Sequence, residues 1–180
     1  VKNNILYWQS LTGDRLYAAD SRLLRSRTAP PWQITNSVHE IGRTCVTDGM
    51  LTDGLGDVYF TALEHDAVLR LDGDRARKAL AQGRPVDLTR ALEEVVRDPR
   101  LGWPDSLAIG VQGPIGTQGT PVVGGGKWLY ITTSQIHKSA RFAGAGAATD
   151  ARPGADGGAA VQAEESLPAA GHALYRVRLR

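Results

Sequence analysis

The fold is decided by the stretch Asp48-Gly49-Met50-Leu51-Thr52-Asp53-Gly54-Leu55-Gly56-Asp57-Val58-Tyr59-Phe60-Thr61, because the chain repeats it in a looser form. The second copy begins at Asp105-Ser106-Leu107-Ala108-Ile109-Gly110, crosses a glycine-rich stretch and ends at Trp128-Leu129-Tyr130-Ile131-Thr132-Thr133. Each copy has the pattern of an apolar strand, a turn and a second strand built on aromatic and β-branched residues. A repeat of roughly 40–60 residues made only of strands is typical of propeller blades, which must pack against neighbouring blades.

The residues on either side of the repeat continue the strand pattern. Ile5–Trp8 and Arg15–Ala19 flank a turn signal at residues 11–14, and they predict a hairpin. Ala67–Asp72 alternates apolar and polar residues, which predicts a third strand after the first copy of the repeat. Ala173–Leu179 alternates in the same way and predicts a last strand with basic residues on its exposed face.

Four stretches depart from this pattern. We expect one short helix between residues 87 and 98, where Asp87 is a suitable N-cap and apolar residues follow at helical spacing. Segments 110–126 and 143–171 are dominated by glycine or alanine, and we expect flexible solvent loops there. Two prolines in Ala29–Trp32 predict an interruption of regular structure.

Composition and charge exclude several classes of function. The chain has 180 residues, enough for one ordinary core, and its net charge of +2 comes from 21 Lys and Arg against 19 Asp and Glu. Without a basic run, this balance argues against binding to nucleic acid or an anionic membrane. No apolar run approaches the roughly 20 residues of a spanning helix. The single cysteine, Cys45, excludes a disulfide within these residues.

Several motifs follow one another in a characteristic order, and together they resemble the Yellow/major royal jelly protein family, in a form closer to a bacterial relative than to the insect members. They are Ile5–Leu11 with Leu16-Tyr17, Thr47–Met50 with Gly56–Thr61, Trp103–Leu107 with Leu129–Gln135, and Leu174–Val177. The resemblance implies an all-β fold, the C-terminal part of a six-bladed β-propeller related to the senescence-marker/gluconolactonase family. We expect residues 1–180 to form roughly two and a half blades, with blade boundaries near residues 46 and 103.

The same resemblance makes Asp48 the leading candidate for chemistry. In the gluconolactonase relatives, an Asp-Gly pair at the start of an inner strand supplies a ligand to a divalent cation in the central channel, and Asp48-Gly49 matches that pair. Carboxylates that converge near a propeller axis can share calcium or zinc, and such a cation can polarise a lactone carbonyl and activate water. Asp48 is therefore a predicted metal ligand and catalytic residue. The alternative is that Asp48 caps a turn by accepting hydrogen bonds from nearby amides.

Five further residues are candidates for substrate binding. Asp105 is the repeat equivalent of Asp48, although the preceding Trp103-Pro104 favours a structural turn there. The pairs Glu64-His65 and Gln135/His137 follow the second strand of each copy, and we expect them at the rim of a pocket on the same face. The alternative for each histidine is an ordinary solvated surface position.

Three functions remain open at this point. The first is a metal-dependent hydrolase or isomerase that acts on a lactone-like small molecule in the central channel. The second is a propeller that binds a small molecule without chemistry, and the third is a protein-interaction scaffold. The resemblance also implies a secreted or periplasmic protein whose missing N-terminal blades, including an inner strand ahead of Lys2, belong to the same chain.

Overall fold

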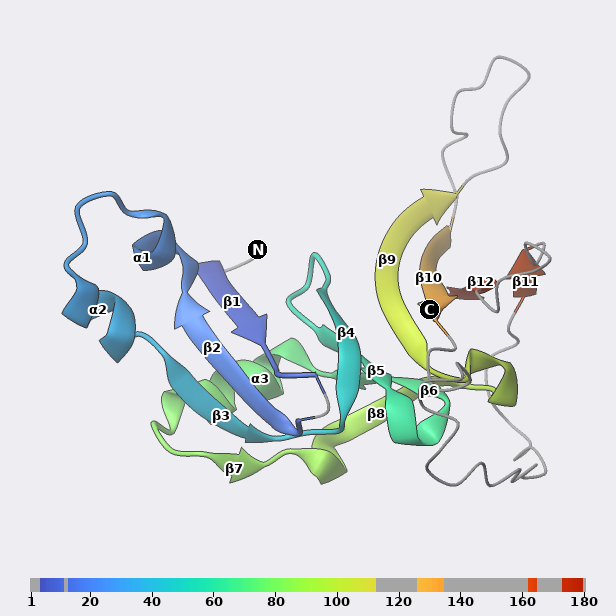
Figure 1. Cartoon of the computed structure of the whole chain (residues 1–180), viewed down its shortest axis with the longest axis horizontal. Coiled ribbons are helices and arrows are strands. Elements are labelled where there is room, and N and C mark those ends of the chain that lie inside the picture. Colours follow the sequence, from blue (N-terminus) through green and yellow to red (C-terminus); the bar gives the residue numbers. More distant parts are fainter. Residues whose placement is uncertain (1–3, 12, 113–125, 135–161, 165–172, 180) are drawn as a thin grey trace, which may run out of the picture.

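The computed structural model describes residues 4–11, 13–112, 126–134, 162–164 and 173–179. Within them the chain is mostly β-sheet, organised as three four-stranded sheets (Figure 1). The predicted all-β character is confirmed at this level. The α-helices of the described residues are short and lie beside the sheets: α1 (Ser21–Arg25), α2 (Pro31–Asn36) and α3 (Gly73–Ala81).

The first sheet has the strand order β1-β2-β3-β7. Its members are β1 (Ile5–Trp8), β2 (Arg15–Asp20), β3 (His39–Arg43) and β7 (Val86–Asp87). The hairpin of β1 and β2 is confirmed, with Ile5 paired to Asp20 and Trp8 paired to Tyr17. Strand β7 was not predicted: it comes from a later part of the chain and pairs with β3 in parallel.

The second sheet has the order β4-β5-β6-β8, and all its neighbours are antiparallel. Its members are β4 (Thr47–Thr52), β5 (Val58–Ala62), β6 (Ala67–Leu71) and β8 (Leu92–Arg97). The turn between β4 and β5 forms because the Asp53 carboxylate accepts hydrogen bonds from the amides of residues 55, 56 and 57 at 2.8, 2.9 and 3.0 Å. The first copy of the repeat is therefore a hairpin, as predicted.

The helix predicted between residues 87 and 98 is wrong. These residues form the end of β7, a 3-10 turn η3 (Thr89–Ala91) and β8. The β-branched residue Val96 pairs with Val68 of β6, and this tertiary pairing outweighs the helical spacing. The helix of this region is α3, which begins after Asp72 because the Asp72 side chain accepts hydrogen bonds from the amides of residues 74 and 75.

The third sheet has the order β11-β12-β10-β9. Its members are β9 (Pro104–Gln112), β10 (Gly126–Thr133), β11 (Gln162–Glu164) and β12 (Ala173–Arg178). The two predicted loops are therefore wrong at three places: β9 extends to Gln112, β10 starts at Gly126, and β11 lies inside segment 143–171. The rest of both segments lies outside the described residues. Strand β12 is confirmed, with Tyr175 and Val177 buried and Arg178 exposed.

The two prolines at residues 30 and 31 begin a helix, whereas an interruption of regular structure was predicted there. Pro31 is the first residue of α2 rather than part of an irregular break, and Pro30 occupies the N-cap position. The first position of a helix accepts proline because its amide would have no partner inside the helix in any case. The interruption ends at Pro30.

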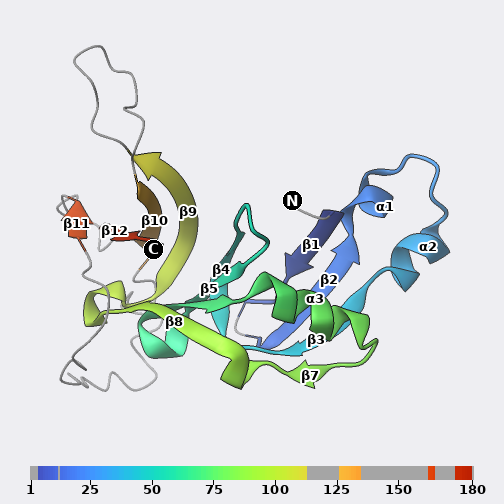
Figure 2. The same cartoon turned by 180° about the vertical axis from the view of Figure 1, so that it is seen from behind.

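Two apolar clusters hold the sheets together. The first joins the first and second sheets around Leu16, Ile41 and Phe60, each with no exposed surface. The second joins the second and third sheets around Leu129 and Ile131, which are also fully buried. Each such side chain contributes about 1.5–3 kcal/mol by leaving water. The middle sheet is thus covered on both faces, and β4 lies between β1 and β9 (Figures 1 and 2).

Candidate functional site

The start of β4 contains a β-bulge that re-aims Asp48. In the pairing of β4 with β5, Asp48 and Gly49 together lie opposite the single residue Thr61. The Thr61 hydroxyl accepts hydrogen bonds from the Asp48 amide at 3.2 Å and from the Gly49 amide at 2.8 Å. These hydrogen bonds satisfy two amides that the interrupted ladder would leave without partners, and the hydroxyl that accepts them belongs to a fully buried residue. Bulges of this kind are frequent beside functional sites.

The start of β9 repeats the same bulge. Asp105 and Ser106 together lie opposite Thr132, and the Ser106 amide donates a hydrogen bond to the Thr132 hydroxyl at 3.2 Å. The Asp105 carboxylate accepts a hydrogen bond from the neighbouring Ser106 hydroxyl, also at 3.2 Å. The repeat that is visible in the sequence therefore extends to the backbone conformation and to the threonine that supports it.

The two bulges lie against each other. A Cβ atom placed on Gly49 would come within 1.9 Å of the Asp105 carbonyl oxygen, so the approach of β9 to β4 requires glycine at this position. Asp48 and Asp105, predicted from repeat copies far apart in the sequence, are thus brought together at the starts of neighbouring strands. Both side chains are half-buried.

Trp103 connects the third sheet to Asp48. Its indole Nε1 donates a hydrogen bond to Asp48 Oδ2 at 2.9 Å. The backbone of Trp103 has a φ of 53°, a left-handed conformation that is uncommon for a bulky residue, and its carbonyl oxygen accepts a hydrogen bond from the Ser134 amide at 3.2 Å. Within the described part of the chain, Asp48 Oδ1 accepts no hydrogen bond. The carboxylate is therefore oriented at one oxygen and open at the other.

Glu64 and His65 lie at a different place. They belong to the 3-10 turn η2 (Leu63–His65), and both side chains are exposed. They line a pocket of about 210 Å³ between the first and second sheets, which Asp48 does not line. The other walls include Asp14, Arg43, Thr44, Cys45 and Leu69. These two rim candidates are therefore not joined to Asp48 by this pocket.

The thiol in that pocket is not set up as a nucleophile. Burial raises the pKa of Cys45 to about 12, above its ordinary value of 9.0, so that the thiolate is scarce at neutral pH. Cys45 is a free cysteine among the described residues. Its neutral form suits a structural position at the approach to β4.

Two of the predicted site residues are not described by the structure. Gln135 and His137 lie outside the described residues, which stop at Ser134 before this segment. Ser134 itself has a buried hydroxyl that makes no hydrogen bond within the part of the chain that the structure describes. Since its amide is bonded to Trp103, this hydroxyl is a polar group close to the residue that orients Asp48.

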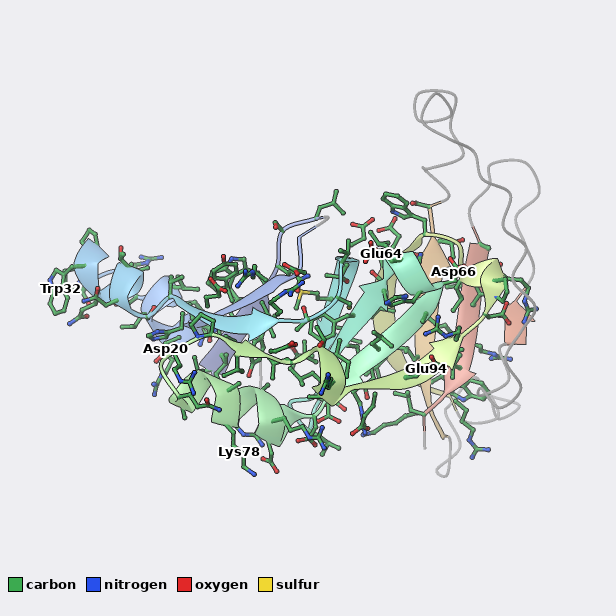
Figure 3. All side chains as sticks on the ribbon, turned by 90° about the horizontal axis from the view of Figure 1, so that it is seen from below. Asp20, Trp32, Glu64, Asp66, Lys78 and Glu94 are labelled. Carbon is green, nitrogen blue, oxygen red and sulfur yellow. The ribbon has the colours of Figure 1, made fainter. Side chains whose placement is uncertain are left out.

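A second pocket was not predicted from the sequence. It has a volume of about 390 Å³ and lies at the α1 end of the first sheet, distant from Glu64 (Figure 3). Its walls include Asn4, Asp20, Arg22, Ser37, His39 and Leu80. Hydrogen bonds from Arg22 lower the pKa of Asp20 to about 2, so the carboxylate stays charged while it caps α1. The available signal was Asp20 at the end of a predicted strand, but that pattern indicates a helix cap rather than a site.

Comparison with known proteins adds no assignment: no protein-family model matches the chain, and no curated protein matches it. Among the described residues, no three His, Cys, Asp or Glu side chains come together as a group that could hold a metal ion. None of the helices in the described ranges has the length and apolar character needed to cross a membrane. The geometry at Asp48 is accordingly the main guide to function.

Proposed function

We propose that this chain is part of a secreted or periplasmic β-propeller of the Yellow/major royal jelly type that binds a small molecule where the inner strands begin. In this proposal Asp48 holds a divalent cation, and the protein is a hydrolase or isomerase of the gluconolactonase type acting on a lactone-like substrate. The observation that carries the proposal is the state of the Asp48 carboxylate. It is half-buried, oriented at Oδ2 by Trp103, and has Oδ1 open within the described residues.

The surroundings of Asp48 support a binding role. A side chain that only caps its own bulge would accept hydrogen bonds from the amides of that bulge, but those amides bond to Thr61 instead. The Asp48 carboxylate is therefore not needed to satisfy the local backbone. Its hydrogen-bond partner, Trp103, lies 55 residues away along the chain. Carboxylates that bind metal ions are typically oriented by such a hydrogen bond from a residue that does not itself touch the metal.

The donor set fits one ligand of a divalent cation. Carboxylate oxygen is a hard donor that calcium accepts readily and that zinc also accepts. A bound cation would polarise a substrate carbonyl and lower the pKa of a water molecule. In this arrangement Thr61 holds the bulge, Trp103 orients the carboxylate and Asp48 binds. Further ligands in this proposal come from beyond the described residues.

Two alternatives have support of their own. The oriented carboxylate suits a ligand that carries a positive charge or a hydrogen-bond donor, which supports a propeller that binds a small molecule without chemistry. Trp32 and Leu55, each 63% exposed, support a protein-interaction scaffold instead. They lie on α2 and on the β4–β5 turn, apart from the start of β4.

Calorimetric titration with calcium and with zinc tests the proposal. We expect Asp48→Asn to weaken cation binding by at least about tenfold, because the amide keeps an oxygen for Trp103 but loses the charge. Asp105→Asn makes the same change in the neighbouring bulge, and it should weaken cation binding less than Asp48→Asn does, because it removes a nearby charge but not the proposed ligand. Hydrolysis of a panel of five- and six-membered lactones should fall further with Asp48→Asn than with Asp105→Asn.

The outcomes separate the alternatives. Cation binding that is unchanged by Asp48→Asn would remove Asp48 from the site. Cation binding through Asp48 without turnover of any lactone would favour the non-catalytic binding protein. If Asp48→Asn only lowers the melting temperature and no cation binds, the carboxylate is a structural link between β4 and Trp103.

A further inference from the structure

The connection between β2 and β3 carries the positive excess of the chain. This connection, the α1–α2 segment (residues 21–38), contains Arg22, Arg25 and Arg27 and none of the 19 Asp and Glu of the chain. Since the chain has 21 Lys and Arg and a net charge of +2, the residues outside this segment are slightly acidic. The balance over the whole chain gave no support for an anionic partner, but the distribution of charge along it does.

Two of the three arginines are not neutralised within the described residues. Arg22 forms an ion pair with Asp20, with 2.7 Å between Nη2 and Oδ2. Arg25 donates hydrogen bonds to a serine hydroxyl and an asparagine side-chain oxygen, both neutral, at 3.3 and 3.5 Å. Among the described residues neither Arg25 nor Arg27 forms an ion pair, and both are exposed. The α1–α2 segment therefore presents two full positive charges to solvent.

Apolar side chains are exposed on the same segment. Trp32 of α2 is 63% exposed and Leu24 of α1 is 42% exposed. Helices α1 and α2 contact each other and lie at one end of the molecule, beside the first sheet (Figures 1 and 2). Figure 3 shows Trp32 at that end. Tryptophan favours the headgroup level of a bilayer, and the apolar stem of arginine can lie along the same boundary.

An apolar side chain of equal exposure elsewhere has the opposite charge around it. Leu55 is also 63% exposed and lies in the β4–β5 turn between Asp53 and Asp57, with no basic residue from one aspartate to the other. An anionic surface would attract the α1–α2 segment and repel this turn. Exposure alone does not distinguish the two places, whereas charge does.

We propose that the α1–α2 segment docks the protein on the surface of a bilayer that contains anionic lipids. Trp32 and Leu24 enter the headgroup region, while Arg25 and Arg27 pair with lipid phosphates. The occupant follows from charge complementarity between the acid-free segment and the negative surface. A flat bilayer also suits a segment at the end of the molecule, because it can reach α1 and α2 without contacting the third sheet. This docking is independent of the role proposed for Asp48.

Flotation of the full chain with lipid vesicles tests the docking. We expect binding to phosphatidylcholine vesicles that contain about a third phosphatidylglycerol, a steep loss of binding with added salt, and no binding to phosphatidylcholine alone. The double variant Arg25→Gln, Arg27→Gln should weaken binding by at least about tenfold, and so should Trp32→Ala. Leu55→Ala is the matched control, since it removes an equally exposed apolar side chain, and it should bind as the natural chain does.

A second measurement uses a variant that keeps the size and aromatic character of the exposed residue. On anionic vesicles the tryptophan emission of the natural chain should shift to shorter wavelength, and the shift should be absent in Trp32→Phe, which still binds. Equal binding to both vesicle types, or no binding to anionic vesicles at low salt, would overturn the proposal. Self-association that Trp32→Ala abolishes, without vesicle binding, would also overturn it and assign the segment to a protein contact.

Discussion

The bulges at the starts of β4 and β9 share one backbone design and differ in what reaches their carboxylates. In both, an aspartate and a small residue lie opposite a threonine whose hydroxyl accepts an amide hydrogen bond. Asp48 is contacted by Trp103 from the segment that leads into the third sheet, whereas Asp105 is contacted by its own neighbour, Ser106. The local sequence thus sets the bulge, while the next sheet sets the chemistry of the carboxylate.

The largest effect should come from the residue that lets the bulges meet. We expect Gly49→Ala to destabilise the protein by about 3 kcal/mol, because the new Cβ atom would lie 1.9 Å from a backbone oxygen that cannot rotate away. Gly54→Ala is the control in the same hairpin, since no atom lies within 4 Å of its Cβ position. Urea unfolding of both variants measures the difference. A loss below that of Gly54→Ala would mean that β4 and β9 do not touch as described.

The next largest effect should be a difference in stability between variants of the two threonines that support the bulges, Thr61 and Thr132. We expect Thr61→Val to cost about 2 kcal/mol, because it leaves the amides of Asp48 and Gly49 without their acceptor, the hydroxyl of the fully buried Thr61. Thr132→Val should cost about 0.5 kcal/mol or less, since Thr132 is exposed and water can replace its hydroxyl. Thr61→Ser, which keeps the hydroxyl, should recover part of the loss. Equal costs at the two threonines would show that the bulges are equally buried.

A smaller effect is expected at the contact between the sheets. Trp103→Phe removes the indole N–H and should cost about 1 kcal/mol through the lost hydrogen bond to Asp48. When the same change is made in the Asp48→Asn background, the cost should fall, because the charged acceptor is already gone. Thermal melts of the four proteins form a double-mutant cycle. Additive costs would show that Trp103 acts through packing alone.

The smallest effect concerns pH at the approach to β4. Burial raises the pKa of Cys45 to about 12 from 9.0, so the stability that its neutral thiol contributes is complete below pH 9 and is lost as the pH rises towards 12. Between pH 7 and pH 10 this group should cost about 1 kcal/mol. The measurement is the difference in urea unfolding between the natural chain and Cys45→Ala at the two pH values. An identical pH dependence in both would place the thiol in contact with solvent.

The strands were predictable where the pattern and the turn chemistry agreed. The β4–β5 hairpin combines an apolar run, the Asp53 turn and a β-branched return strand, and each of these signals is local. The prediction of a helix between residues 87 and 98 failed because the spacing of the apolar residues there suits a helix as well as a strand. The pairing of Val96 with Val68 stabilises the strand. Helix α3 carried a usable signal in Asp72, which stands just before it.

The candidate site was predictable in part, for a related reason. Asp48 and Asp105 stand out because the repeat places them at equivalent positions. The hydrogen bond from Trp103 to Asp48 spans 55 residues, and Trp103 has a left-handed backbone conformation. No local sequence pattern predicts either feature. The approach of Gly49 to Asp105 likewise appears only when two sheets are packed together.

The difference between the two bulges is tested most directly by observing both carboxylates at once. Carbon-13 NMR of the side-chain carboxyl groups of Asp48 and Asp105, recorded during titration with calcium and then with zinc, reports on each aspartate separately. We expect the Asp48 signal to move and saturate with one of these cations while the Asp105 signal stays in place. A stationary Asp48 signal at saturating cation, or movement of Asp105 instead, would contradict the role assigned to Asp48.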